Sequence, residues 1–82
     1  MKLYGYQEDH PPVEGVPAKA LAEVTLVASP DELRKIAQFL SDAANDMESM
    51  GSVYSHEHLA DKQSGFDACP HFVVFSPAEN VR

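Results

Sequence analysis

The stretch that decides the fold is SPDELRKIAQFLSDAANDMESMG, residues 29–51. Ser29 is suited to the N-cap of a helix, because its hydroxyl can accept a hydrogen bond from a free backbone N–H, and the proline after it needs no such partner. Glu32, three residues after the cap, completes a capping box. Gly51 suits the left-handed backbone that ends many helices. These signals predict a helix over residues 30–50.

The apolar residues of this helix gather on one side. They recur at the i, i+3, i+4, i+7 spacing of a helix with one buried face. The stripe consists of Leu33, Ile36, Ala37, Leu40, Ala43, Ala44 and Met47. Phe39 and Met50 widen it. The sequence therefore predicts an amphipathic helix that packs one face against a sheet.

Three other segments have the composition of β-strands. Residues 1–7 contain two tyrosines and a leucine, residues 19–28 alternate between apolar and mixed side chains, and residues 71–76 are apolar on both faces. Residues 8–18 contain three prolines and are expected to form a loop. The order is β-β-α-β, which predicts an α+β fold with one long helix on a short sheet. At 82 residues we expect one domain.

The strand patterns also predict which faces are covered. The expected core face of the second strand consists of Ala22, Val24, Leu26 and Ala28. Gly5 inside the first strand indicates a bulge or a close contact. One helix covers only one face of a sheet, whereas a strand that is apolar on both faces needs cover on both. A second copy of the chain would supply that cover, so we expect a homodimer.

Composition excludes several partners and compartments. The net charge is −7, from 13 acidic and 6 basic residues, and such a surface repels nucleic-acid phosphates and anionic lipid. We therefore expect neither nucleic-acid binding nor membrane binding. Cys69 is the only cysteine, and the sequence contains neither a signal peptide nor the roughly 20-residue apolar segment of a membrane span. These features predict a cytoplasmic protein.

Candidate site residues cluster after the helix, in residues 51–70, which are expected to form a loop with a short helical turn from Ser55 to Lys62. On a strand two histidines one residue apart would point the same way, whereas on a helix they would not. The possible nitrogen and sulfur ligands of zinc are His56, His58, Cys69 and His71. A small metal- or ligand-binding domain is therefore one alternative. Since the spacing matches no known zinc pattern, we expect no metal or cofactor.

Catalytic patterns are not found in the sequence. Cys69 stands beside a proline without an orienting third group, and this arrangement is typical of a small buried hydrophobe. The glycines are too scattered for a phosphate loop. Asp42 and Asp46 lie four residues apart on the helix, and surface charge explains them. We expect a non-enzymatic binding protein, or a dimerisation or interaction module without activity of its own.

The helix and the segment after it resemble the immunity protein 32 family of bacterial polymorphic-toxin systems. The resemblance covers roughly residues 20–77. It rests on Ser29-Pro30-Asp31-Glu32-Leu33 with Ile36-Ala37-Gln38-Phe39-Leu40, on Ala43-Ala44-Asn45-Asp46-Met47-Glu48 with Gly51, and on Ser55-His56-Glu57-His58-Leu59 with Asp61 ahead of Phe72-Val73-Val74-Phe75. The His-Glu-His-Leu piece is the most specific of these.

The resemblance implies a small α+β protein that binds and neutralises a cognate toxin without catalysis. An acidic surface would suit a basic toxin, which it would attract electrostatically. The residues expected to contact the toxin are His56, Glu57, His58, Asp61, Asp42 and Asp46.

Overall fold

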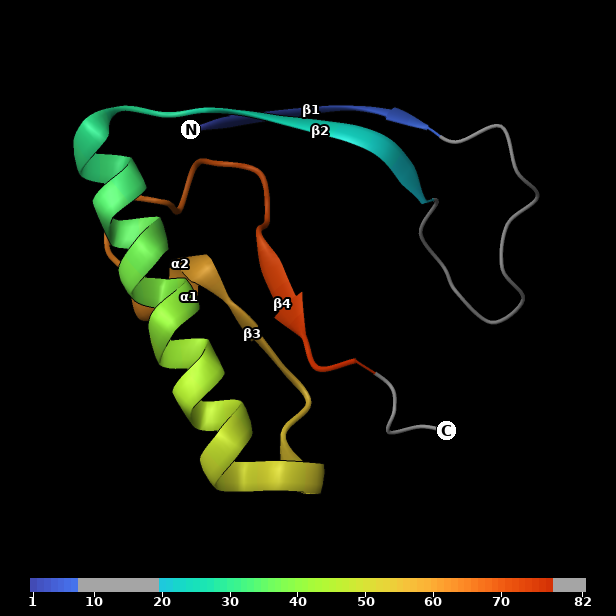
Figure 1. Ribbon diagram of the computed structural model, residues 1–82. Helices are drawn as coiled ribbons and strands as arrows, with labels where there is room; N and C mark the ends of the chain where they lie inside the picture. The colour runs from blue at the N-terminus through green and yellow to red at the C-terminus, as the bar shows by residue number, and fades with distance from the viewer. Residues whose placement is uncertain (8–19, 78–82) are drawn as a thin grey trace.

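The computed structural model describes residues 1–7 and 20–77, and it has an α+β fold (Figure 1). The elements, in chain order, are β1 (Lys2–Gln7), β2 (Leu21–Val27), α1 (Pro30–Met50), the 3-10 turn η1 (Gly51–Val53), β3 (His56–His58), α2 (Leu59–Lys62) and β4 (Val73–Phe75). The predicted loop over 8–18 lies outside the described residues. No helix within the described ranges is long and apolar enough to cross a membrane.

The long helix has the predicted bounds and the predicted caps. The Glu32 backbone N–H donates to the Ser29 hydroxyl at 3.1 Å, and the Ser29 N–H donates to the Glu32 carboxylate at 2.8 Å. Gly51 follows the last helical residue with a φ of 60°, and its N–H donates to the Met47 carbonyl. The capping box and the helix end at Gly51 are therefore confirmed, whereas a ψ of −131° places Gly51 outside the left-handed helical region that was predicted.

Replacing Ser29 with alanine should destabilise the protein, because the Glu32 N–H loses its acceptor. We expect the free energy of unfolding to fall by about 1 kcal/mol. Urea unfolding followed by far-ultraviolet circular dichroism measures the change. The control is Ser41→Ala, at an exposed position inside the same helix, where no cap is lost and alanine is the better helix former. Equal stability of Ser29→Ala and the parent protein would contradict the role of the cap.

The core is small, and most of it faces the segment that follows α1. Phe39 is only 1% exposed, and its ring meets the edge of Phe72 at a centroid distance of 6.3 Å. The buried hydrophobic side chains of the described residues are Ile36, Phe39, Ala43, Tyr54, Leu59 and Phe66. Half-buried Leu26 and Ala28 pack against this cluster from the β2 side.

The buried face of α1 differs from the predicted stripe. Ile36, Phe39 and Ala43 are buried, whereas Leu33 is 46% exposed and Leu40 is 44% exposed. At 100° per residue the buried face is rotated by roughly 60° from the middle of the predicted stripe. The stripe is wider than the residues that pack on it, so its far flank stays open to solvent.

The described residues form two small antiparallel sheets where a single sheet was expected. β1 pairs with β2, and β3 pairs with β4. The predicted third strand over 71–76 is shorter, Val73–Phe75, and its Phe75 is 65% exposed. The prediction of a helical turn from Ser55 is wrong for His56–His58, because these residues extend to pair with β4 and the helical turn begins only at Leu59.

A register shift changes the apolar face of β2. The pairs are Tyr6 with Glu23 and Gln7 with Leu21, so Ala22 is left without a partner. This bulge brings the Leu21 side chain over Gly5, where a Cβ atom would lie 2.8 Å from Leu21 Cδ1. The predicted close contact at Gly5 is therefore confirmed.

The predicted core face of β2 is only partly covered. Leu26 and Ala28 pack on the core, but Ala22 is exposed and Val24 is 62% exposed. The sheet of β1 and β2 reaches the core only at the end that contains Leu26, and the rest of the sheet extends away from α1 (Figure 1). Leu21 and Val24, which both lie on the Gly5 side of the sheet, therefore remain open.

Candidate functional site

β3 divides the His-Glu-His segment between two faces. His56 and His58 share one face, with ring centroids 5.2 Å apart, and Glu57 points to the other. The His56 ring stacks on Phe75 at 4.8 Å, and its Nδ1 lies 2.9 Å from the Ser55 hydroxyl. The contact residues expected from the sequence therefore belong to two separate surfaces.

Three imidazoles form a row on the first surface. The ring of His71 meets that of His58 at a centroid distance of 5.9 Å, next to the contact between His58 and His56. His56 and His71 are exposed, and His58 is half-buried. Each ring nitrogen can donate or accept a hydrogen bond, depending on the tautomer. This histidine row offers a partner polar contacts next to the apolar ring of Phe75.

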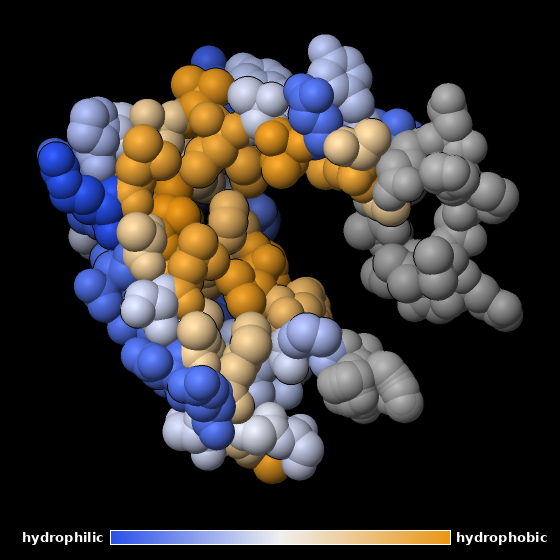
Figure 2. Space-filling model, viewed as in Figure 1, coloured by the Kyte–Doolittle hydropathy of each residue, from blue (hydrophilic) through white to orange (hydrophobic). Residues whose placement is uncertain are grey.

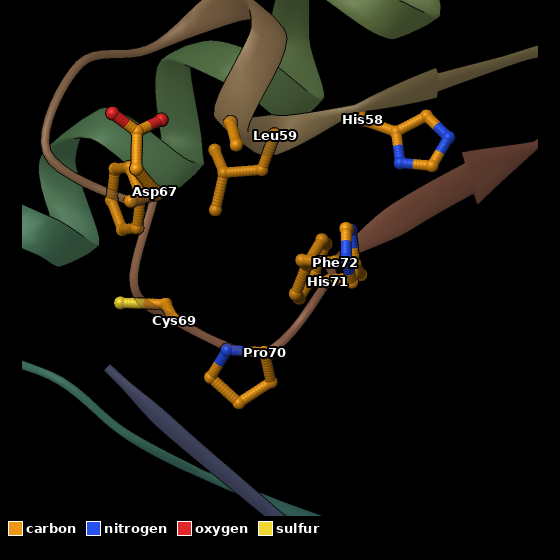
Figure 3. Close-up of a pocket in the computed structure, with 9 residues that line it drawn as sticks. His58, Leu59, Asp67, Cys69, Pro70, His71 and Phe72 are labelled. Atoms are coloured by element: carbon orange, nitrogen blue, oxygen red, sulfur yellow. The ribbon is translucent and has the colours of Figure 1, made fainter.

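Cys69 does not join the histidines. Its sulfur points away from His58 and His71 across a pocket between them (Figure 3), and it lies 3.5 Å from the Met1 amine. This pocket has a cavity volume of about 30 Å³, which is room for no more than a couple of water molecules. The described residues contain no group of three or more His, Cys, Asp or Glu residues that could hold a metal ion. The structure therefore does not assemble the four-residue zinc set considered above.

The second surface surrounds the hydroxyl of Tyr54. Tyr54 is 7% exposed, and among the described residues its hydroxyl oxygen has no hydrogen-bond partner. Burial raises the pKa of this hydroxyl, and the nearby carboxylates of Glu57 and then Asp46 raise it further. Glu57 is close enough to act on the phenol, although the two groups do not meet the geometry of a hydrogen bond. The Glu57 side chain is 11% exposed.

The remaining predicted contact residues lie apart from Tyr54. Asp42 is exposed and accepts a hydrogen bond from the Gln38 amide at 2.8 Å. Asp61 is exposed on α2. Of the predicted contact residues, Glu57 and Asp46 are those whose charges raise the pKa of Tyr54. Sequence reasoning missed Tyr54, because a single tyrosine after a helix carries no periodic signal.

Glu32 also links the start of α1 to Met1, the residue that precedes β1. Its Oε2 lies 2.8 Å from the Met1 amine. The hydrogen bond that the amine donates to Glu32, followed by the one that it donates to Cys69, raises the pKa of the amine above its usual 8.0. The same amine, followed by the Ser29 backbone, lowers the pKa of Glu32 below its usual 4.5.

The stability of the fold should therefore fall at both low and high pH, with a plateau between them. The depressed pKa of Glu32 stabilises the fold above pH 4.5, and this contribution is lost as the pH falls further. The raised pKa of the amine stabilises the fold below pH 8.0, and this contribution is lost as the pH rises through the folded-state pKa. Thermal melting from pH 3 to 10 should show a smaller loss at both ends in Glu32→Gln. An unchanged profile in that variant would contradict the pair.

The comparisons with known proteins give no family for the chain. No protein-family model matches it, and no curated protein or solved structure gives a significant match. The resemblance to the immunity protein 32 family therefore rests on the sequence motifs alone.

Proposed function

We propose that this chain is an immunity-type protein, which binds a cognate bacterial toxin and neutralises it by stoichiometric occlusion. The observation that carries the proposal is a broad apolar surface that the fold leaves uncovered. In Figure 2 apolar colour gathers around a hollow, along one side of α1 and under the sheet of β1 and β2. The opposite edge of α1 is hydrophilic.

This surface, which we call the inner face, gathers exposed apolar side chains from two elements. Its large side chains are Leu21 and Val24 from β2 and Leu33 and Leu40 from α1, which are 44–62% exposed. The largest apolar patch on a typical monomer measures roughly 300–600 Å² and is often functional. On α1 the exposed alanines Ala37 and Ala44 lie on the same flank as Leu33 and Leu40 and extend this apolar surface. A protein partner would remove this surface from water.

The charge of the chain suggests the character of that partner. A net charge of −7 would steer a basic protein toward the chain and raise its rate of association. The apolar inner face would then supply most of the affinity, because burial of apolar area drives most protein–protein association. A basic toxin, such as a nuclease with a phosphate-binding cleft, fits both features.

Co-expression with the product of the gene immediately upstream tests the proposal. We expect the chain to restore growth of the host and to co-purify with the toxin in equal amounts. Growth arrest that the chain does not relieve, with no complex on purification, would refute the immunity function.

A second copy of the chain is the competing occupant of the inner face, and the homodimer stays a prediction. Light scattering of the purified protein at about 100 μM distinguishes the two occupants, since weak dimers form at that concentration. A monomer leaves the inner face free for the toxin. A dimer that Leu40→Gln dissociates would assign the face to self-association instead.

A further inference from the structure

One face of the sheet of β3 and β4 carries two imidazoles side by side. His56 and His58 are one residue apart on β3, so strand geometry turns both rings to the same side. The opposite face carries Glu57 and Val74, and Val74 packs against the core. The centroids of the two imidazole rings are 5.2 Å apart. His56 is exposed and His58 is half-buried, so neither ring is closed off from solvent.

The His56 ring is held in place by its neighbours. It stacks on Phe75, its partner across the sheet, at a centroid distance of 4.8 Å and an interplanar angle of 20°. Its Nδ1 lies 2.9 Å from the Ser55 hydroxyl. Histidines that bind metal ions usually donate their second ring N–H to an oxygen in this way. In the tautomer that donates Nδ1–H to Ser55, the lone pair of His56 Nε2 is free to bind a cation.

The separation of these two rings matches that of imidazoles bound to one metal ion. Zn–N bonds measure about 2.0–2.1 Å, which places the centres of two imidazoles on a tetrahedral ion roughly 5 Å apart. The 5.2 Å between His56 and His58 fits this value, whereas the 5.9 Å between His58 and His71 is wider. No group of three such ligands occurs among the described residues, so the chain would supply two. Its net charge of −7 favours the approach of a cation.

We propose that His56 and His58 form a two-imidazole site for a late first-row divalent metal ion, the class that contains Ni²⁺, Cu²⁺ and Zn²⁺. Imidazole nitrogens suit these ions, whereas Mg²⁺ prefers oxygen ligands. The remaining coordination positions would be open to water or to a ligand group of another molecule. The site does not depend on the immunity function, because it consists of groups of this chain alone.

Metal titration of the purified chain, without a histidine tag, tests the site. The probes are ZnCl₂ and NiCl₂, which are added separately at neutral pH and followed by isothermal titration calorimetry. We expect both ions to bind saturably, and MgCl₂ to bind at least about tenfold more weakly. Saturable binding of neither ion would overturn the proposal. Equal affinity for Mg²⁺ would also overturn it, because the acidic surface would then explain the binding.

Single variants assign the two ligands. His56→Asn and His58→Asn should each weaken Zn²⁺ binding at least about tenfold, because only one imidazole then remains. His56 is exposed, so His56→Asn should keep the fold, which far-ultraviolet circular dichroism checks. The matched controls are His71→Asn, which removes an exposed imidazole of the same row, and Cys69→Ser, which removes the thiol. Both should bind Zn²⁺ within about twofold of the parent. A loss in either control as large as in His56→Asn would overturn the assignment.

Nuclear magnetic resonance of the nitrogen-15-labelled imidazoles identifies the atoms that bind the ion. We expect ZnCl₂ to shift Nε2 of His56 and one ring nitrogen of His58, and to leave the nitrogens of His71 almost unchanged. Ser55→Ala removes the oxygen that orients His56, so it should weaken Zn²⁺ binding several-fold and let the His56 ring change its tautomer. Larger nitrogen shifts at His71 than at His56 and His58 would overturn the site.

Discussion

Phe39→Ala is expected to unfold most of the protein at room temperature. Phe39 is 1% exposed, contacts Phe72 edge-on, and belongs to a core of only six buried hydrophobic residues in the described ranges. Truncating a buried phenylalanine costs about 3–5 kcal/mol, which approaches the whole stability of many small domains. Urea unfolding followed by circular dichroism measures the loss.

The neighbouring residue provides the control. Leu40 is 44% exposed, and leucine and alanine have similar helix propensities, so Leu40→Ala should cost less than about 1 kcal/mol. The sequence pattern alone places Leu40 in the core stripe and Phe39 at its edge. Equal losses in the two variants, or a larger loss in Leu40→Ala, would contradict the rotated packing of α1.

The second large effect concerns binding. The double variant Leu33→Gln and Leu40→Gln should weaken the complex with the toxin about 100-fold, because two apolar anchors of the inner face are lost. Glutamine is a good helix former and carries no charge, so neither helix propensity nor steering changes. Isothermal titration calorimetry measures the affinity, and thermal melting should show that the fold is retained.

The opposite side of α1 supplies the matched control for binding. Gln38 and Asn45 are both exposed there, so Gln38→Ala with Asn45→Ala should leave the affinity within about twofold of the parent. If these changes weaken the complex as much as the leucine changes do, the inner face is not the contact surface.

The elements that the sequence predicts well are those with local signals. The capping box of Ser29 and Glu32 and the glycine at position 51 fix both ends of α1, and the structure has the same bounds. Each signal involves residues at most a few positions apart, so no tertiary contact is needed to recognise it. The first two strands follow for the same reason, because their composition and alternation are local.

The elements that the sequence does not predict depend on distant contacts. His56–His58 is a strand because it pairs with Val73–Phe75, and nothing in the three residues themselves requires an extended chain. The rotation of α1 has a similar origin, since Phe66 and Phe72 approach the helix from one side and select Phe39 over Leu40. When the apolar stripe of a helix is wider than the surface that packs on it, the sequence does not show which edge of the stripe will be buried.

For the candidate site, too, the sequence predicts local features but not those that depend on distant contacts. Residue types pointed to His56, Glu57 and His58 as a group, but strand geometry separates Glu57 from the two histidines. Glu57 lies near Tyr54, whose burial is revealed only by the three-dimensional packing. The zinc set failed for a comparable reason, because Cys69 turns toward the Met1 amine.

The central claim is neutralisation by stoichiometric binding, and titrating the toxin's activity with the purified chain tests it most directly. We predict that activity falls linearly and reaches zero at one molar equivalent of the chain, without dependence on incubation time. Full activity at excess chain would contradict the immunity function. A time-dependent loss at amounts well below one equivalent would instead show that the chain acts catalytically.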